Sequence, residues 1–192
     1  EVCSPFLGGG SVELALAEKG VWVYGYDTFE PLIWFWRALL GNPEALAKEA
    51  DSLRKHKDYY YGYRGLPKED FNLIKEELRN EKEYSLQNAA KFYALNRSSF
   101  SGATLSGGWS KRASYERFTD SSITRVKEFN QPKLYVSAQH FKHSIPAHPK
   151  TFLYLDPPYL LGKDKENLYG DAGNKHKGFD HAGLVNILKE RD

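Results

Sequence analysis

Several features that would define a protein class are scarce or absent in this sequence. It has no methionine, a single cysteine (Cys3), and no apolar run long enough to span a membrane. One cysteine excludes an intramolecular disulfide framework, and because no signal peptide is visible we expect a cytoplasmic protein with no membrane partner. The six histidines have no ligand spacing, so no metal is expected either. A formal charge of only +2 does not by itself indicate a nucleic-acid partner.

What is present is typical of a globular protein. The 192 residues, 41% hydrophobic and 27% charged, suffice for one buried core and an inserted lobe. Aromatic residues make up 15%, and their rings can stack on bases, although ordinary packing accounts for most of them. The chain begins within an apparent strand and stops soon after a helix begins. We therefore expect a piece of a longer protein, truncated at both ends.

Hydrophobic periodicity predicts a β-α-β unit at the start of the chain. Residues 2–3 indicate the end of a strand, residues 12–19 a helix, and residues 21–26 a second strand that ends at Asp27. Two strands joined by a helix in this way pair in parallel, with a right-handed crossover. This part of the chain therefore predicts an α/β sheet.

The middle of the chain lacks this alternation. Helical patterns dominate there, and between residues 98 and 114 the periodicity gives way to Ser, Gly and Thr, which indicates a loop or hairpin. Strand–helix alternation resumes at residues 134–137. We predict a discontinuous catalytic domain, residues 1–58 and 128–192, with an inserted region at residues 59–127.

The most informative stretch is residues 151–159, a short apolar strand followed by Asp156, Pro157, Pro158 and Tyr159. Two successive prolines end the strand and make the backbone rigid. The Asp156 carboxylate and the Pro157 carbonyl then present acceptors at the carboxyl end of a strand, where open α/β sheets bind ligands. Such acceptors beside a flat ring suit a planar amino group. The alternative interpretation is a Pro-Pro turn with a routine Asp cap.

A glycine-rich turn lies upstream, between the first strand and its helix. Residues 4–11 read Ser-Pro-Phe-Leu-Gly-Gly-Gly-Ser, and glycines there allow a close approach of backbone to a ligand. Ser11 is a candidate helix cap. Asp27 follows 17 residues after Gly10, at the end of the next strand, where a carboxylate commonly accepts from ribose hydroxyls. The spacing is not GxGxxG and no Walker lysine follows, but the order favours a nucleoside-containing cofactor.

These segments together resemble the Dam-like (D12) class of DNA adenine-N6 methyltransferases. The resemblance rests on Phe-Leu-Gly-Gly-Gly at residues 6–10, on Asp27 and on Asp-Pro-Pro-Tyr at residues 156–159. Residues 95–102 and 179–184 resemble two further segments of that class, in the same order. The resemblance implies a Rossmann-like fold that transfers a methyl group from S-adenosylmethionine to N6 of a flipped-out adenine in double-stranded DNA.

The resemblance also assigns roles to single residues. Asp156, Pro157, Pro158 and Tyr159 would form the catalytic loop, in which Tyr159 stacks on the extruded base. Cofactor binding would use the glycine turn, the two strand-end acids and one aromatic residue: Pro5, Phe6, Gly8, Gly10, Asp27, Phe141 and Asp156. In this family an acidic residue often precedes that phenylalanine, whereas this chain has His140.

Segment 97–117 is the predicted DNA-contacting region. It carries four basic residues against one acidic residue, Glu116, a net charge of +3 in a Gly/Ser-rich setting, which favours phosphate contact. The predicted DNA-binding residues are Arg97, Ser98, Ser101, Lys111 and Arg112. Ser101 and Leu105 stand where GATC-methylating relatives carry Asn and Arg, so GATC recognition is not supported and the target sequence stays open.

Two rival functions follow from the same residues. The catalytic loop could serve another planar amine, namely cytosine N4, an RNA adenine or a glutamine side chain. Asp at position 156 and the inserted segment favour DNA adenine over these. Alternatively, the chain could be a nucleic-acid-binding module without catalysis. A cognate restriction endonuclease acting on the same site is a further partner that such an enzyme can have.

Overall fold

The computed structural model of the chain describes residues 1–56, 64–159 and 178–191. Internal contacts divide these residues into two compact units. The first, the sheet unit, comprises residues 1–33, 131–159 and 178–191. The second, the helical unit, comprises residues 34–56 and 64–130. No helix among the described residues is both long and apolar enough to cross a membrane.

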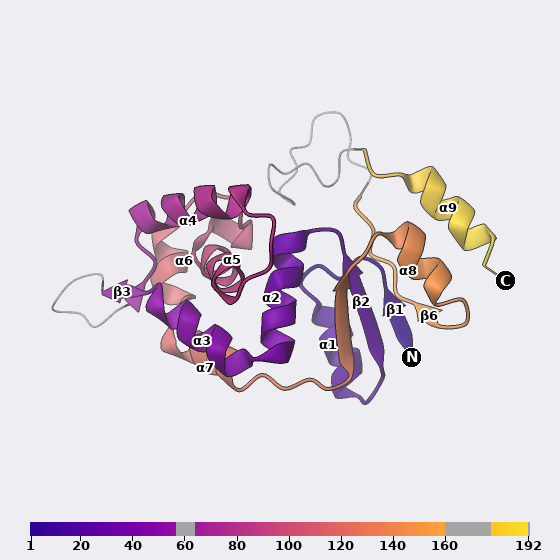
Figure 1. The fold of residues 1–192 in the computed structure, drawn as a ribbon, viewed down its shortest axis with the longest axis horizontal. Helices are drawn as coiled ribbons and strands as arrows, with labels where there is room; N and C mark the ends of the chain where they lie inside the picture. Colours follow the sequence, from indigo (N-terminus) through magenta and orange to yellow (C-terminus); the bar gives the residue numbers. More distant parts are fainter. Residues whose placement is uncertain (57–63, 160–177, 192) are drawn as a thin grey trace. The chain divides into compact units, whose positions relative to one another are not determined.

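The sheet unit contains a four-stranded, all-parallel sheet in the order β5-β2-β1-β6 (Figure 1). Its elements are β1 (Val2–Ser4), α1 (Ser11–Glu18), β2 (Val23–Asp27), β5 (Leu134–Ala138), α8 (Phe141–Ala147), β6 (Phe152–Leu153) and α9 (His181–Lys189). In register, Val23 of β2 lies between Val2 of β1 and Leu134 of β5. The predicted parallel β-α-β unit and the Rossmann-like α/β fold are confirmed.

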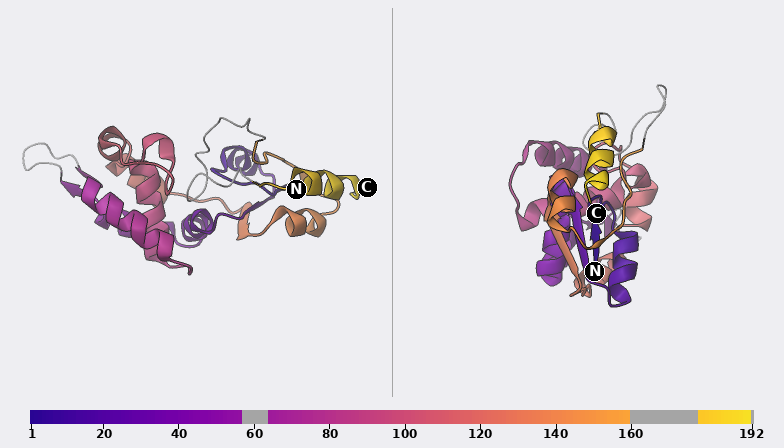
Figure 2. Two further views of the ribbon diagram at one scale, coloured as in Figure 1. Left: turned by 90° about the horizontal axis from the view of Figure 1, so that it is seen from above. Right: turned by 90° about the vertical axis from the view of Figure 1, so that its right-hand side faces the viewer.

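Helices cover both faces of this sheet. Helix α1 (indigo) lies on one face and α8 (orange) on the other (Figure 2). The chain runs outward from β1 to β2 and β5 and then returns past β1 to β6. Right-handed crossovers in opposite directions along the sheet put the connecting helices on opposite faces.

The glycine turn is attached to β2 by close packing. The Leu7 N–H donates to the Tyr26 carbonyl at 2.8 Å, and the Leu7 side chain lies on Gly25. A Cβ at Gly25 would meet Leu7 Cδ1 at 2.8 Å, which is closer than real Cβ contacts allow. Gly25 therefore makes room for Leu7, and this contact positions the turn at the end of the strand.

A small apolar core holds α8, α9 and β6 together. Phe141, Ile145 and Leu184 are buried in it, and Leu153 of β6 packs against them. Asp180 caps α9 as predicted, because its Oδ1 accepts from the Gly183 N–H at 2.8 Å. These contacts fix the chain on both sides of residues 154–159.

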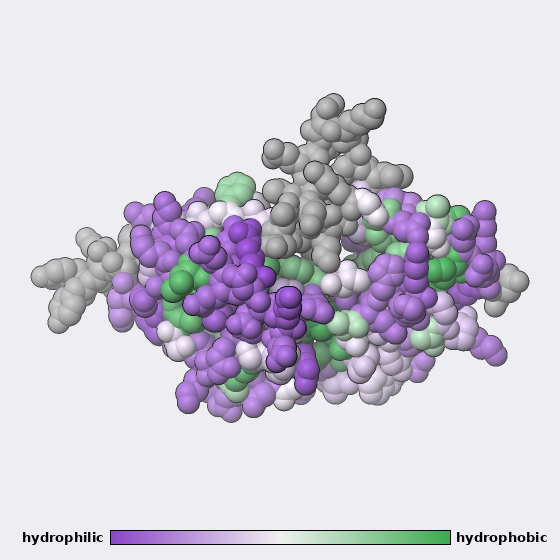
Figure 3. Space-filling model, turned by 45° about the horizontal axis from the view of Figure 1, so that its top comes forward, coloured by the Kyte–Doolittle hydropathy of each residue, from purple (hydrophilic) through white to green (hydrophobic). Residues whose placement is uncertain are grey.

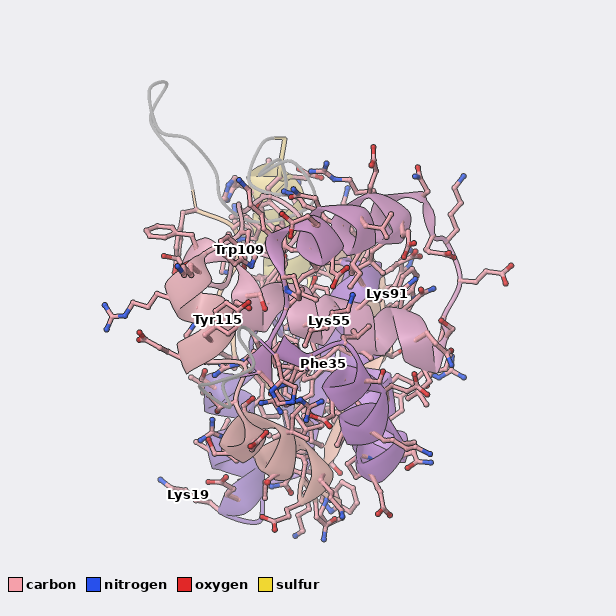
Figure 4. The ribbon with its side chains drawn as sticks, turned by 90° about the vertical axis from the view of Figure 1, so that its left-hand side faces the viewer. Lys19, Phe35, Lys55, Lys91, Trp109 and Tyr115 are labelled. Carbon is pink, nitrogen blue, oxygen red and sulfur yellow. The ribbon has the colours of Figure 1, made fainter. Side chains whose placement is uncertain are left out.

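The helical unit is built around α5, which packs against α3, α4 and α6. Its elements are the greater part of α2 (Glu30–Gly41), then α3 (Pro43–Ser52), β3 (Lys55–His56), β4 (Arg64–Gly65), α4 (Lys68–Asn80), α5 (Leu86–Ser98), η1 (Phe100–Gly102), α6 (Lys111–Glu116) and α7 (Asp120–Lys127). Phe35 of α2 stacks on Tyr93 of α5, with ring centroids 5.5 Å apart (Figure 4). Aromatic packing of this kind accounts for much of the chain's high ring content.

Residues 34–56, which the sequence grouped with the catalytic domain, belong to the helical unit. Helix α3 packs against α5 and α7, and the buried Arg54 donates to Asp51 at 2.8 Å and to Asp120 at 2.6 Å. The predicted boundary between residues 58 and 59 lies outside the described residues. The role of residues 59–127 as a target-recognition region stays a prediction.

The predicted loop at residues 98–114 is partly helical. Residues 100–102 form a single 3₁₀ turn, Ser99 bridges to Trp109, and α6 begins at Lys111 because Ser110 caps it. The Trp109 indole N–H donates to the Leu66 carbonyl at 2.9 Å and so anchors the segment (Figure 4). The prediction missed α6 because its six residues are too short to show a periodicity. Hydrophilic residues make up most of the described surface on the face drawn in Figure 3.

Candidate active site

The order of the strands marks one edge of the sheet as the candidate site. Successive strands run outward from β1 to β2 and β5, whereas β6 lies on the other side of β1. In open α/β sheets, ligands bind where the order reverses, outside the carboxyl ends of the strands. Here that point lies between β1 and β6. The Tyr154 N–H donates to the Cys3 carbonyl at 3.0 Å, so the pairing of β1 with β6 extends one residue beyond β6, toward the predicted catalytic loop at residues 156–159.

The glycine turn leaves β1 at this point. Gly8 and Gly10 have φ of 50° and 69°, a left-handed conformation that disfavours other residues. A Cβ at Gly8 or Gly9 would meet nothing within 4 Å, so a ligand can approach the backbone there. Gly10, not Ser11, is the N-cap of α1, and no side chain caps this helix. The expectation that Ser11 caps α1 is therefore wrong, because Ser11 is already the first helical residue.

Asp27 lies at the carboxyl end of β2 and ties the glycine turn to that strand. Its Oδ2 accepts from the Gly8 N–H at 3.0 Å, and its Oδ1 accepts from the Phe29 N–H at 2.9 Å. Asp27 is buried, with only 8% of its surface exposed. These two bonds fix the carboxylate at the strand end, next to the glycine turn.

The catalytic loop is exposed at the carboxyl end of β6. Asp156 and Tyr159 face solvent, the latter 63% exposed, while Pro157 and Pro158 are half-buried. The Tyr159 hydroxyl donates to Asp156 Oδ1 at 3.2 Å, and this bond raises the pKa of the phenol. A carboxylate and a ring that the sequence placed three residues apart are thus in contact.

Three phenylalanines form an apolar wall beside this edge. Phe6 lies 5.8 Å from Phe141 and 5.6 Å from Phe179 between ring centroids, and Phe141 lies 5.2 Å from Phe179. Phe141 is only 2% exposed, because the other two rings cover it, whereas Phe6 and Phe179 remain half-buried. Pro5 precedes this wall and is buried. Phe179 is therefore a candidate contact that was not among the predicted site residues.

His140 caps α8 with its Nδ1, which accepts from the Lys142 N–H at 3.2 Å. Partial burial, and to a smaller extent the electrostatic effect of the neighbouring Lys142 and His143, lower its pKa. The residue that replaces the family's acid at this position thus has a structural role in the chain itself.

A second carboxyl group at this edge was missed by sequence reasoning. Glu13, in the first turn of α1, is 2% exposed, and its Oε1 accepts from the Ser4 hydroxyl at 2.5 Å. Burial raises the pKa of Glu13, the hydrogen bonds from Ser4 and its own backbone oppose that shift, and the nearby Asp156 adds to it. The one sequence signal was a glutamate on the apolar face of a predicted helix.

The predicted DNA-binding residues separate into two groups within the helical unit. Arg97 donates through Nε and an Nη to the Arg117 carbonyl, at 3.0 and 2.7 Å, and Ser98 is fully buried. Ser101, Lys111 and Arg112 are exposed. Their roles stay predictions, but only the second group faces solvent.

A hollow of about 330 Å³ lies beside the exposed group. It is lined by Phe100, Ser101, Ser110, Arg112, Ala113, Glu116 and Arg117. Phe100 is 71% exposed, which is unusual for a phenylalanine, and it was not among the predicted site residues. Its exposure can be read only from the fold.

The comparison with known families decides what class of enzyme this is. The family model for D12 class N6 adenine-specific DNA methyltransferase matches residues 1–192. The chain belongs to this family. D12 class enzymes methylate adenine in DNA, so DNA is the substrate class and the enzymatic prediction is confirmed. A search of curated proteins found no match.

In this D12 class chain, the predicted catalytic loop, residues 156–159, follows the strand at the switch point. The described residues contain no group of three or more His, Cys, Asp or Glu side chains arranged to hold a metal ion. The glycine turn follows β1, Asp27 ends β2, and the exposed Asp156 follows β6, so all three lie at the carboxyl ends of neighbouring strands. They are the described groups available to a cofactor and an amine.

Proposed function

We propose that this D12 class chain transfers a methyl group from S-adenosylmethionine to N6 of an adenine that has been extruded from double-stranded DNA at a specific site. The observation that carries the proposal is the position of Asp156, at the strand end where the order of the sheet reverses and opposite the glycine turn. Family membership supplies the reaction class.

The residues of the sheet unit fit the proposed cofactor. Open space at Gly8 and Gly9 allows it to approach the turn, and the Asp27 carboxylate at the end of β2 is an acceptor suited to ribose hydroxyls. Phe6 and Phe179 offer accessible apolar surface for the adenine ring, with Phe141 supporting them from beneath. Pro5 and Gly10 shape the two ends of the turn.

The catalytic loop acts on the target amine. The N6 lone pair of adenine is delocalised into the ring, which makes the nitrogen a weak nucleophile. Hydrogen bonds from its two hydrogens to the Asp156 carboxylate and the Pro157 carbonyl favour a pyramidal nitrogen with a localised lone pair. Bound S-adenosylmethionine supplies an electrophilic methyl group. Pro157 and Pro158 keep both acceptors fixed, so orientation contributes much of the rate.

A base within a duplex cannot present N6 to a pocket, so the target adenine is flipped out. The Tyr159 ring, 63% exposed beside Asp156, offers a face on which the flipped base stacks. The contact between Tyr159 and Asp156 supports this proposal, because recognition of a planar amine requires a stacking ring beside a hydrogen-bond acceptor.

The second part of the proposal concerns DNA contact by the helical unit. Lys111 and Arg112 are exposed, and among the residues that the structure describes Arg112 pairs with Glu116, at 2.7 Å across an exposed i,i+4 contact. Such surface pairs are weak, so a phosphate can compete for the guanidinium. Ser101 and the exposed Phe100 line the same hollow. We propose that this surface contacts DNA.

The experiment that tests the reaction is single-molecule sequencing of DNA treated with the purified protein and S-adenosylmethionine. N6-methyladenine at one short sequence is the expected result. Methylcytosine on DNA, or methylation confined to RNA or to glutamine in protein, would assign the loop to another amine. Asp156→Asn, which keeps the size of the side chain, serves as the inactive control.

DNA contact is tested by the dependence of affinity on salt. Lys111→Gln and Arg112→Gln should each reduce the slope of log K against log salt by about one, the value for one lost phosphate contact. Lys82→Gln, an exposed lysine between α4 and α5, is the matched control. Equal slopes in all variants would place DNA on another surface. A cognate restriction endonuclease, if one exists, should be blocked by DNA that this enzyme has methylated.

A further inference from the structure

Glu13 is a buried acid that the proposed reaction does not use. It lies on α1, directly after the glycine turn, and is 2% exposed. Among residues 1–56, 64–159 and 178–191, no lysine, arginine or histidine forms an ion pair with it. Buried charges are normally paired, because removing an ion from water costs several kcal/mol.

The location of this carboxyl group is well defined. Its partner Ser4 is the last residue of β1 and is fully buried, so the hydrogen bond at 2.5 Å holds the carboxyl at the carboxyl end of the central strand. Strand β1 pairs directly with β6, whose chain continues to Asp156. Burial raises the pKa of Glu13, the hydrogen bonds from Ser4 and from its own backbone oppose that shift, and the charge of Asp156 adds a smaller increase.

Glu13 and Asp156 lie beyond the carboxyl ends of neighbouring strands, and two acids repel one another when both are ionised. A fold gains nothing from a buried acid at position 13, since a glutamine or an apolar residue there would avoid both the desolvation and the repulsion. A cation bound beside Glu13 would offset both penalties. The proposed cofactor is such a cation, because its methionine part carries a sulfonium and an ammonium group.

We propose that Glu13, held by Ser4, is a cofactor-binding residue that supplies the counter-charge for the cationic methionine part of S-adenosylmethionine. This inference rests on the proposed function, since it requires that cofactor. It predicts that the charge of Glu13, more than its shape, sets affinity. The glycine turn and Asp27 would hold the nucleoside part of the same molecule, independently of Glu13.

Calorimetric binding to the purified protein tests the inference without any measurement of turnover. Glu13→Gln keeps an acceptor for Ser4 and the volume of the side chain, and it should bind S-adenosylmethionine at least tenfold more weakly. 5′-Methylthioadenosine, which has the nucleoside but neither cation, should bind wild type and variant equally. Glu18→Gln, the same change at an exposed position of α1, is the matched control and should change neither affinity.

S-adenosylhomocysteine identifies the cation. It retains the ammonium group but not the sulfonium. If Glu13→Gln loses affinity for this ligand as well, the ammonium is the group that Glu13 binds. If the variant loses affinity for S-adenosylmethionine alone, the group is the sulfonium. Both results support the inference.

Two results would overturn it. One is an unchanged affinity of Glu13→Gln for S-adenosylmethionine. The other is a loss of affinity for methylthioadenosine as large as that for S-adenosylmethionine, which would mean that the variant deforms the glycine turn. If wild type itself binds no S-adenosylmethionine, the proposed function fails and this inference fails with it. Wild-type binding therefore distinguishes the two failures.

Discussion

The Tyr159 hydroxyl donates a hydrogen bond to Oδ1 of Asp156 at 3.2 Å, at the exposed end of β6. The contact joins the group proposed to bind the target amine to the ring proposed to stack on the target base. Because both groups are exposed, solvent competes for the bond and the ring is easily displaced. An incoming adenine can therefore take the Asp156 acceptor without a large cost.

Substitutions at Tyr159 should separate the ring from its hydroxyl. Tyr159→Ala should weaken binding of target DNA roughly tenfold or more, the effect of losing one base–aromatic stack. Tyr159→Phe and Tyr159→Trp should retain most of the affinity, because the face of the ring matters more than the exposed hydroxyl bond. 2-Aminopurine at the target position reports extrusion by its fluorescence, and a mismatch opposite the target should tighten binding. Unchanged binding and turnover in Tyr159→Ala would assign the ring to the fold.

Removal of the Asp156 carboxylate should abolish methyl transfer and leave cofactor binding largely intact. Asp156→Ala loses the acceptor for the N6 hydrogens, whereas the glycine turn and Asp27 are untouched. Calorimetry with S-adenosylmethionine and transfer of a radiolabelled methyl group measure the two properties separately. Near-normal turnover of the variant would contradict the role given to Asp156.

Asp27→Ala should weaken the binding of S-adenosylmethionine by about 1.5–3 kcal/mol, the usual range for hydrogen bonds to a charged group. The cofactor KM should rise more than kcat falls, because uniform binding is lost. Asp27→Asn is the informative companion: it keeps an acceptor for one of the two backbone N–H groups, of Gly8 and Phe29, and loses the charge. If neither variant changes affinity for the cofactor, Asp27 serves only to anchor the turn.

The buried acid Glu13 should reduce stability at neutral pH. Burial raises its pKa above the ordinary value of 4.5, so the folded state binds the proton more tightly than the unfolded state does. The resulting stability is fully present below about pH 4.5 and is lost as pH rises through the folded pKa. Glu13→Gln should therefore raise the melting temperature at pH 7 and have little effect near pH 4. A melting temperature that falls at pH 7 would contradict this prediction.

Cys3 should be inert toward alkylation in the native protein. Burial raises the pKa of its thiol to about 11, so almost no thiolate is present at pH 8. Iodoacetamide should label the unfolded protein quickly and the folded protein only at the rate of unfolding. Mass spectrometry of the intact protein measures both rates, and fast labelling under native conditions would show that β1 opens locally.

The β-α-β unit at the start of the chain and the end of β6 ahead of the Pro-Pro pair could be predicted from the sequence. Residues 2–27 carry their own periodicity, with glycines at the turn and Asp27 at the strand end, so local preferences lead to the observed β-α-β unit. The Pro-Pro pair after β6 restricts the backbone in any context. These features are properties of neighbouring residues, and a single sequence contains them in full.

Other features depend on contacts between distant residues, and the sequence could not supply them. Nothing local indicated that Arg97 would turn inward to the Arg117 carbonyl, or that Phe100 would remain exposed. The helix α6 was missed because its six residues are too short to show a periodicity, and the Trp109 bond to the Leu66 carbonyl that anchors the segment before it joins residues 43 positions apart. The local sequence around a basic residue in a Gly/Ser-rich segment is the same whether its side chain faces solvent or donates to a backbone carbonyl.

Glu13 illustrates the division most clearly. From the sequence alone it is a helical residue nine positions after Ser4, with an ordinary place in the first turn. The sequence determined the strand, the glycine turn and the helix, because these follow from local backbone preferences and periodicity. Only the tertiary structure brought its carboxyl group to Ser4 and near Asp156, because burial and charge depend on what the rest of the chain packs around a residue.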